Sequence, residues 1–181
     1  MKHKIRKEIL KKRNALTKTQ IKLRSKKIEK ILFSLKEYKK AKTVMFYVSF
    51  GSEVFTHDMI KDALKSKIVV VPKTLDHRMT PSLIKSFKEL NCKDKYGILQ
   101  PFKVKRADKN KIDLVIVPGV AFDLDGYRIG YGKGYYDKFL KGMRAEKIGL
   151  AYEFKMIKKV PNEEHDIKVD KVVTEKDVYK I

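Results

Sequence analysis

The stretch from Gly126 to Asp137 reads GYRIGYGKGYYD, and its residue types suit the binding of an anion. Glycines let backbone N–H groups approach a ligand closely and adopt positive φ values. Arg128 and Lys133 add positive charge, and a guanidinium can bind two phosphate oxygens at once. A helix that begins after Gly134 would add unpaired N–H donors and the positive end of its dipole. The stretch therefore predicts a phosphate-binding loop.

This loop fits neither common nucleotide-binding fingerprint. Gly132-Lys133 is followed by glycine instead of Ser or Thr, which excludes the P-loop pattern. The dinucleotide pattern GxGxxG also fails, because neither Gly130 nor Gly132 has the third glycine at the required spacing. A simpler interpretation is a hairpin, since Asp125-Gly126 is a strong turn signal. The residues alone leave both interpretations open.

The order of apolar segments predicts what positions this loop. The apolar residues between about 3 and 36 recur at helical spacing, and Thr17 is the expected N-cap of a second helix. Apolar runs predict strands at 43–48, 67–73, 113–119, 147–152 and 169–174, with 79–87 as a further strand despite its proline. Helices are expected at 57–67 and 135–143.

Strands that alternate with helices are typical of an α/β domain with a mainly parallel sheet and helices on both faces. We expect one domain over residues 1–181, with the sheet and the ligand loops within about 43–181. The chain length and a hydrophobic fraction of 43% suit a single core. In such sheets ligands bind beyond the carboxyl ends of the strands, where the glycine loop is expected to lie.

The formal net charge is +22, which suggests a nucleic acid as a partner because basic surfaces neutralise phosphate. Only seven of the 44 cationic residues are arginine, the residue preferred for bidentate phosphate and base contacts. Lysine spread along the whole chain is typical of a solvated surface, and its field favours small anionic substrates. We therefore expect no nucleic-acid partner. The protein is also expected to be a monomer.

The same composition bears on the compartment. A single cysteine, Cys92, excludes an intrachain disulfide and suits a reducing cytoplasm. No apolar run approaches the roughly 18 residues of a membrane span, and no signal-peptide pattern follows the basic start. The expectation is a cytoplasmic protein without membrane contact.

The run PGVAFDLDGYRIGYGKGYYDKFL resembles the signature of the 5-formyltetrahydrofolate cyclo-ligases, also called methenyltetrahydrofolate synthetases. Three further segments resemble that family in the family's order: KHKIRKEIL, YVSFGSEVFTHDMI and VPNEEHDIKVDKVVT. The resemblance implies a three-layer α/β/α fold with a Rossmann-like sheet. It also implies conversion of 5-formyltetrahydrofolate and MgATP to 5,10-methenyltetrahydrofolate, ADP and phosphate.

Carried over by motif, the resemblance implies a set of site residues. Those expected to bind ATP are Lys2, Arg6, Arg128, Gly130, Gly132, Lys133, Gly134, Tyr135 and Tyr136, with Arg128 and Lys133 as the catalytic cations. Those expected to line the folate site are Val48, Glu53 and Tyr135, and those expected to hold Mg²⁺ are Asp137 and Asp170. Some members carry arginine where this chain has Tyr131, so one charge that could contact phosphate is absent.

The implied reaction suits these residue types. Transfer of the γ-phosphoryl group of ATP to the formyl oxygen creates a leaving group, which N10 of the folate then displaces. The nucleophile belongs to the substrate, so the protein must supply positioning and charge, not a Ser-His-Asp set. Glu53 can hydrogen-bond the pterin ring, and of Tyr135 and Tyr136 we expect one to contact a ligand. His165 and Asp166 are expected to stabilise a turn.

Two alternatives stay open at this point. One is a nucleotide- or phosphate-binding α/β protein without ligase activity. The other, less favoured, is a basic RNA-binding protein, which predicts clustered cations with exposed aromatic side chains.

Overall fold

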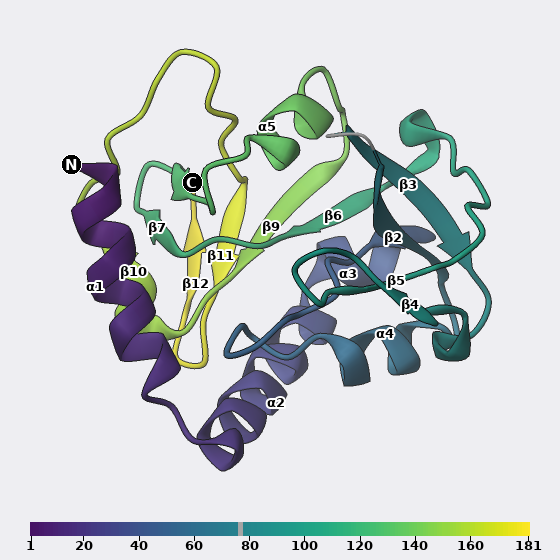
Figure 1. The fold of residues 1–181 in the computed structure, drawn as a ribbon, viewed down its shortest axis with the longest axis horizontal. Coiled ribbons are helices and arrows are strands. Elements are labelled where there is room, and N and C mark those ends of the chain that lie inside the picture. The colour runs from purple at the N-terminus through teal and green to yellow at the C-terminus, as the bar shows by residue number, and fades with distance from the viewer. Residues whose placement is uncertain (76–77) are drawn as a thin grey trace.

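A seven-stranded sheet in the order β12-β11-β9-β6-β1-β2-β3 runs through the protein (Figure 1). The computed structural model describes residues 1–75 and 78–181. The strands of this sheet are β1 (Thr43–Met45), β2 (Ile68–Leu75), β3 (Arg78–Ile84), β6 (Leu114–Val117), β9 (Glu146–Leu150), β11 (Lys171–Val173) and β12 (Val178–Lys180). Pairing is parallel from β11 to β2 and antiparallel at β3 and β12. The predicted mainly parallel sheet is confirmed.

The strand order creates a topological switch point between β1 and β6. From β1 the chain continues to β2 on one side, whereas β6, β9 and β11 follow one another on the other side. β6 reads Leu-Val-Ile-Val and is buried at all four residues, as expected for a strand covered on both faces. In open α/β sheets the crevice at such a point, outside the carboxyl ends of the strands, is where ligands bind.

Helices cover the two faces of the sheet unequally. On one face lie α2 (Lys18–Ser34), α3 (Lys36–Lys40) and α4 (His57–Ala63), whose buried apolar residues pack against Leu114 and Ile116. On the other face α5 (Tyr135–Leu140) packs against Val115 and Val117. The three-layer α/β/α arrangement is therefore confirmed, with a thin third layer.

The first helix, α1 (Lys2–Asn14), packs on a separate small sheet. That sheet has the order β10-β7-β8, formed by β10 (Met156–Ile157), β7 (Ala121–Asp123) and β8 (Arg128–Ile129). Figure 1 shows α1 beside β7 and β10, and the buried residue Ile9 clusters with Val120 and Ile129. The glycine loop leaves β8, so α1 lies where it can reach that loop.

Local signals in the sequence explain several boundaries. The predicted N-cap Thr17 is confirmed: its hydroxyl accepts the Gln20 N–H at 3.2 Å, and the Gln20 side chain accepts the Thr17 N–H at 2.9 Å. The segment predicted as a strand at 79–87 forms the antiparallel edge strand β3. Pro81 faces Pro72 there, and an edge strand tolerates a missing donor.

Other elements were not predicted. They include α3, β10 and β12, the two-stranded sheet of β4 (Cys92–Lys93) and β5 (Leu99–Gln100), and the 3-10 helices at Phe87–Glu89, Lys109–Lys111 and Glu153–Lys155. The strand expected at 43–48 ends at Met45, after which the chain enters a loop. His77, one of the histidines without metal-like spacing in the sequence, lies outside the described residues.

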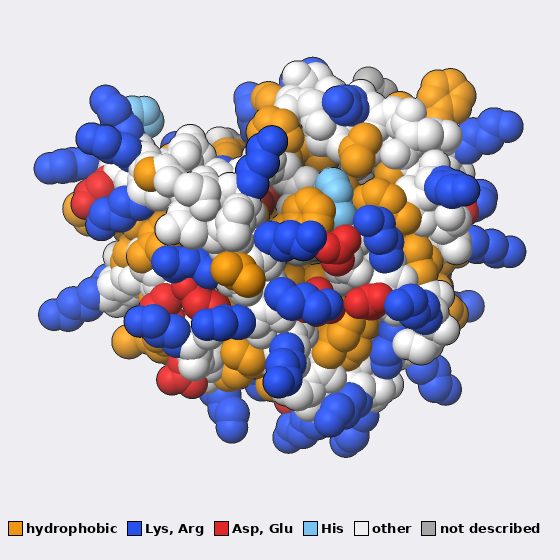
Figure 2. Space-filling model, turned by 90° about the horizontal axis from the view of Figure 1, so that it is seen from below, with side chains coloured by type: hydrophobic (Ala, Val, Ile, Leu, Met, Phe, Trp, Pro, Cys, Tyr) orange, Lys and Arg blue, Asp and Glu red, His pale blue; other side chains and the backbone are white. Residues whose placement is uncertain are grey.

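The charged surface and the helices can be described directly. Figure 2 shows lysine and arginine side chains spread over one face, between hydrophobic and acidic ones, instead of forming one stripe. Such mixing is typical of a solvated lysine-rich surface. Across the described parts of the chain, each helix is too short or too polar to cross a lipid bilayer.

Candidate active site

A cleft of about 960 Å³ opens at the switch point of the large sheet. Its lining includes Val48 from the loop after β1, Thr74 of β2, and Gly119 from the turn after β6. The glycine loop, Gly130–Gly134, and the first turn of α5 close it from the other side. The strand order therefore brings together the loops that the sequence placed at one rim of the sheet.

The glycine-rich stretch forms a hairpin, as one interpretation predicted, followed by a separate loop, for which phosphate binding stays a prediction. The Asp123 carboxylate accepts the backbone N–H groups of Asp125 at 3.1 Å and Tyr127 at 2.8 Å, which closes the β7–β8 hairpin. Gly126 has a φ of 87° at this turn. The loop that follows contains Gly132 at a φ of 95° and ends at the N-cap of α5. The hairpin sets where the chain enters the loop, and the loop that follows is a separate structure that lines the cleft.

The first helix holds the loop from one side. The Arg6 Nε donates to the carbonyl oxygen of Gly130 at 2.9 Å. A Cβ at Gly132 would lie 3.6 Å from the Arg6 guanidinium, so the two segments are in close contact. Arg6 and Lys2 both line the cleft, as the resemblance implied.

Lys2 forms ion pairs with two carboxylates at the rim of the cleft. Its Nζ lies 2.9 Å from Asp166 and 3.3 Å from Glu163. Burial opposes the charge, but these two partners outweigh it and raise the pKa of Lys2. The Asp166 carboxylate also accepts the Glu163 N–H at 2.9 Å, so the expected role of Asp166 in a turn is accompanied by an ion pair.

Arg128 lines the cleft, but its guanidinium is held by partners within the protein. Its guanidinium donates to the Ile167 carbonyl oxygen and lies 2.8 Å from the Asp137 carboxylate, with 5% of the side chain exposed. The same Asp137 oxygen accepts the Ile167 N–H at 3.0 Å. These contacts fix the start of α5 to the segment before β11. Phosphate binding by Arg128 stays a prediction, whereas its structural contacts are observed.

The remaining predicted residues of the loop are also in the cleft. Lys133 is exposed, and Gly134, Tyr135 and Tyr136 line the same cavity. We call Lys2, Arg6 and Gly130–Gly134 the loop end of the cleft. Its cations and its glycine backbone make it the part that suits phosphate groups.

The opposite part, which we call the carboxylate end, contains Tyr47, Val48, Phe50, Glu53 and Tyr136. Glu53 is 9% exposed, and its carboxylate accepts the Phe50 N–H at 2.9 Å and the Tyr131 hydroxyl at 3.0 Å. Val48 and Glu53 are thus brought together as predicted. A buried, anionic acceptor beside aromatic rings suits a flat heterocycle that carries N–H donors.

The Tyr136 hydroxyl is buried without a hydrogen-bond partner among the described residues, although the residue lines the cleft. Burial, followed by the charge of Glu53, raises the pKa of Tyr136, so this phenol keeps its proton. A buried donor that lacks a partner in the protein suits one in a ligand. Tyr136 was predicted to bind ATP, whereas its hydroxyl lies at the carboxylate end.

The expected pairing of Asp137 with Asp170 is not found. Asp170 precedes β11, and its carboxylate accepts the backbone N–H of Lys147, near the start of β9, at 2.7 Å. These are the amino ends of parallel strands, whereas the cleft opens at their carboxyl ends, and Asp170 is not among the residues that line it. Across the described residues, no group of three or more His, Cys, Asp or Glu side chains could hold a metal.

Three residues near Glu53 were not predicted as functional residues. Arg13 is 4% exposed and donates to the Ser52 hydroxyl at 2.9 Å and to the Tyr131 hydroxyl at 2.7 Å. Lys155 is 1% exposed, and burial, followed by the charge of Arg13, lowers its pKa to about 7. The helical spacing of seven between Arg6 and Arg13 was a usable signal for Arg13. For Lys155 the sequence offered none, and Tyr131 had been noted only as the position of a missing arginine.

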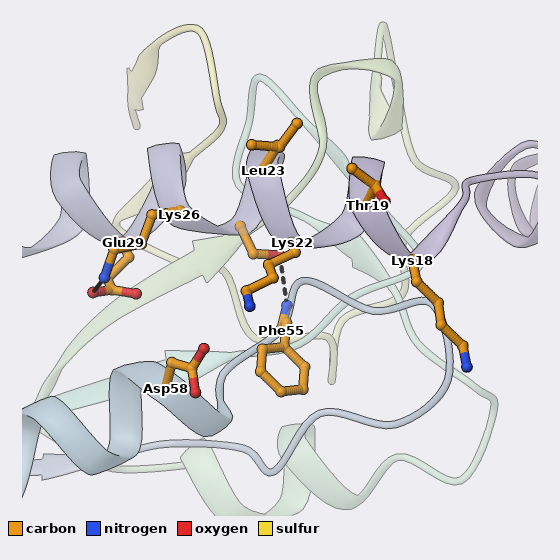
Figure 3. A pocket seen from close by; sticks show the side chains of 9 residues that line it. Lys18, Thr19, Lys22, Leu23, Lys26, Glu29, Phe55 and Asp58 are labelled. Carbon is orange, nitrogen blue, oxygen red and sulfur yellow. Dashed lines mark hydrogen bonds and ion pairs between the residues drawn. The ribbon is translucent and has the colours of Figure 1, made fainter.

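A second hollow of about 370 Å³ lies between α2 and α4 (Figure 3). Its charged side chains include Lys26, which pairs with Glu29 at 2.5 Å and lies 3.9 Å from Asp62. The backbone N–H of Phe55 donates to the Ser25 hydroxyl of α2 there. These groups bind one another, so we place the active site in the larger cleft.

Comparisons with known proteins identify the family to which this chain belongs. The model of the 5-formyltetrahydrofolate cyclo-ligase family matches residues 1–175. The cyclo-ligase of Mus musculus is 32% identical over 77% of this chain and 76% of its own length. That of Haemophilus influenzae is 30% identical over 90% of this chain and 91% of its own.

Solved structures agree. The 5,10-methenyltetrahydrofolate synthetase of Aquifex aeolicus has a TM-score of 0.90 and 37% identity, over 99% of this chain and 92% of that one. The synthetase of Mycoplasma pneumoniae has a TM-score of 0.78 and 27% identity, over 96% and 98%. The chain belongs to the 5-formyltetrahydrofolate cyclo-ligase family.

Proposed function

We propose that this protein catalyses the ATP-dependent cyclisation of 5-formyltetrahydrofolate to 5,10-methenyltetrahydrofolate, with release of ADP and phosphate. The observation that carries the proposal is one cleft with two unlike ends, a cationic glycine loop and a buried carboxylate, in a chain of this family. ATP binds with its phosphates at the loop end. The pterin ring binds at the carboxylate end.

The chemistry needs two displacements. The formyl oxygen attacks the γ-phosphorus of ATP, the bond to the β–γ bridging oxygen breaks, and ADP leaves. N10 of the folate then attacks the activated formyl carbon, N10 loses its proton, the ring closes, and phosphate carries away the former formyl oxygen. Both nucleophiles belong to the substrate, so the protein contributes alignment and charge.

Residues divide between these tasks by position. Lys133 and the backbone N–H groups of Gly130–Gly134 stabilise charge on the moving phosphoryl group, assisted by Lys2 and Arg6. Arg128 fixes Asp137 and the start of α5, so its first role is to hold the loop in shape. Glu53 accepts hydrogen bonds from the pterin amino and N–H groups.

Mg²⁺ fits as part of the nucleotide. Mg²⁺ usually keeps several waters and takes one or two carboxylates together with substrate phosphates. Asp137 lines the cleft and supplies one carboxylate, which fits that pattern without Asp170. Bound there, Mg²⁺ would neutralise phosphate charge.

The basic surface and the assembly complete the proposal. A lysine-rich rim attracts ATP and the glutamate tail of a folate, so we propose small anionic substrates. We further propose that the protein has no nucleic-acid partner and is a cytoplasmic monomer. Incubation with MgATP and 5-formyltetrahydrofolate tests the activity, with the methenyl product followed by its absorbance. Binding of ATP without turnover of the folate would instead favour a nucleotide-binding protein without ligase activity.

A further inference from the structure

Three side chains from three separate segments form a chain of hydrogen bonds at the cleft, which Tyr131 and Glu53 line. Arg13 of α1 donates to the Tyr131 hydroxyl at 2.7 Å, and that hydroxyl donates to the Glu53 carboxylate at 3.0 Å. The Arg13 guanidinium also lies 5.7 Å from the centre of the Tyr131 ring. The three residues stand 118 and 78 positions apart along the chain, so only the folded protein assembles them.

The order of donors gives this chain a direction. Arg13 can only donate, so the phenol accepts from it and directs its own proton to Glu53. Hydrogen bonds in series polarise one another, and a cation at one end strengthens the bond to the carboxylate at the other. Burial and the charge of Glu53 raise the pKa of Tyr131 to about 12, so the phenol remains a donor at neutral pH.

Tyr131 is also part of the glycine loop. It stands between Gly130, whose carbonyl accepts from Arg6, and Gly132. Helix α1 therefore holds two successive residues of the loop, one through the backbone and one through a side chain. A shift of the loop toward phosphate groups moves the Tyr131 hydroxyl relative to Glu53.

We propose that Tyr131 is a positioning residue, which with Arg13 orients the Glu53 carboxylate and couples nucleotide binding at the glycine loop to folate binding at Glu53. The proposal rests on the proposed function and assigns a role to a position where a phosphate-contacting cation is absent. Since coupling between two sites is reciprocal, each ligand changes the affinity for the other by the same factor.

The main test is Tyr131→Phe, which removes one hydroxyl and keeps the half-exposed ring. Calorimetric titration with 5-formyltetrahydrofolate is expected to give about tenfold weaker binding, the scale of one lost hydrogen bond to a charged group. The Kd of a non-hydrolysable ATP analogue is expected to change less than about threefold. In the wild type the analogue changes the folate Kd, and in the variant this effect is reduced or lost.

Tyr127→Phe is the matched control, because it makes the same change four positions earlier, where the ring lies under the Lys168 ammonium. It is expected to leave both affinities unchanged. Arg13→Lys is the second route: it keeps the charge but loses the fork, and it is expected to weaken folate binding in the same direction by a smaller factor.

Hydrogen exchange supplies a measurement that needs no ligand. The Phe50 N–H donates to the same Glu53 carboxylate, so a loosened carboxylate exposes this amide to exchange. Peptides that cover residues 46–56 are expected to exchange faster in Tyr131→Phe than in Tyr127→Phe. If the wild type binds no folate, the proposed function fails, while this exchange result still judges the positioning role.

The positioning role is overturned by either of two results. One is Tyr131→Phe with wild-type folate affinity and unchanged exchange over residues 46–56. The other is an equal loss of folate and nucleotide affinity, which would indicate general damage to the loop.

Discussion

The two ends of the cleft are built in opposite ways. The loop end is open: its glycines lack side chains, and Lys133 is exposed. The carboxylate end is closed: Glu53 is buried and already hydrogen-bonded, and the Tyr136 hydroxyl is buried without a partner. A flexible polyanion suits the first construction, and a rigid ring with fixed donors suits the second.

This difference separates effects on stability from effects on binding. We expect Arg128, which is held by Asp137 and Ile167, to act mainly on stability, and Lys133, which is exposed in the cleft, to act on the substrate. Substitutions at these two cations and at the two ends of the cleft should therefore fail in different ways.

The largest expected effect is on stability. Arg128→Met leaves the half-buried Asp137 carboxylate without its guanidinium and removes the bond to Ile167. Breaking such a pair is expected to lower the free energy of unfolding by about 3–5 kcal/mol. Urea unfolding measures it, with Lys138→Met, on the exposed side of α5, as the control. An unchanged midpoint of urea unfolding would contradict this structural role of Arg128.

Lys133→Ala is expected to act on catalysis with little change in stability, because the side chain is exposed in the cleft. Loss of a charge-assisted bond and of transition-state stabilisation is expected to lower kcat/KM for ATP by about 2–3 kcal/mol in free energy. Steady-state kinetics with varied ATP measure this. Wild-type kinetics in the variant would remove Lys133 from the site.

Glu53→Gln tests the carboxylate end. The amide keeps the shape but loses the charge that accepts donors from the ring, so folate binding is expected to weaken by about 2 kcal/mol. The KM for ATP should stay within about threefold. Equal losses for both substrates would contradict the division of the cleft into two ends.

The smallest expected effect concerns Lys155, buried behind Glu53. Burial and Arg13 lower the pKa of its ammonium to about 7, with Glu53 and Glu175 opposing the shift. The unfolded chain binds this proton more tightly, so this residue's contribution to stability rises as the pH increases from about 7 to 10.5 and is least favourable below 7.

Lys155→Met removes this dependence. The variant is expected to be more stable than the wild type by about 1–2 kcal/mol at pH 7, with a smaller difference at pH 10. Thermal unfolding over this pH range is the measurement. A stability difference that is the same at pH 7 and pH 10 would show that Lys155 does not titrate there.

The same contrast explains what could be predicted from the sequence. The Gly130–Gly134 part of the loop end lies within one motif, and the cap at Thr17, the buried strands and the Asp125-Gly126 turn depend on neighbouring residues. The carboxylate end depends on contacts between distant segments. Nothing near Tyr131 in the sequence indicates Arg13 or Glu53 as its partners. Asp170 was expected beside Asp137 by motif alone, and the strand direction separates it from the cleft.

The most direct test of the central claim is a single-enzyme assay. Wild-type protein is mixed with 5-formyltetrahydrofolate, ATP and Mg²⁺, and the absorbance of the methenyl product is followed over time. The account predicts product formation that requires ATP, releases phosphate in equal amount, and falls strongly in Lys133→Ala. Folded wild-type protein that binds both substrates but forms no methenyl product would contradict it.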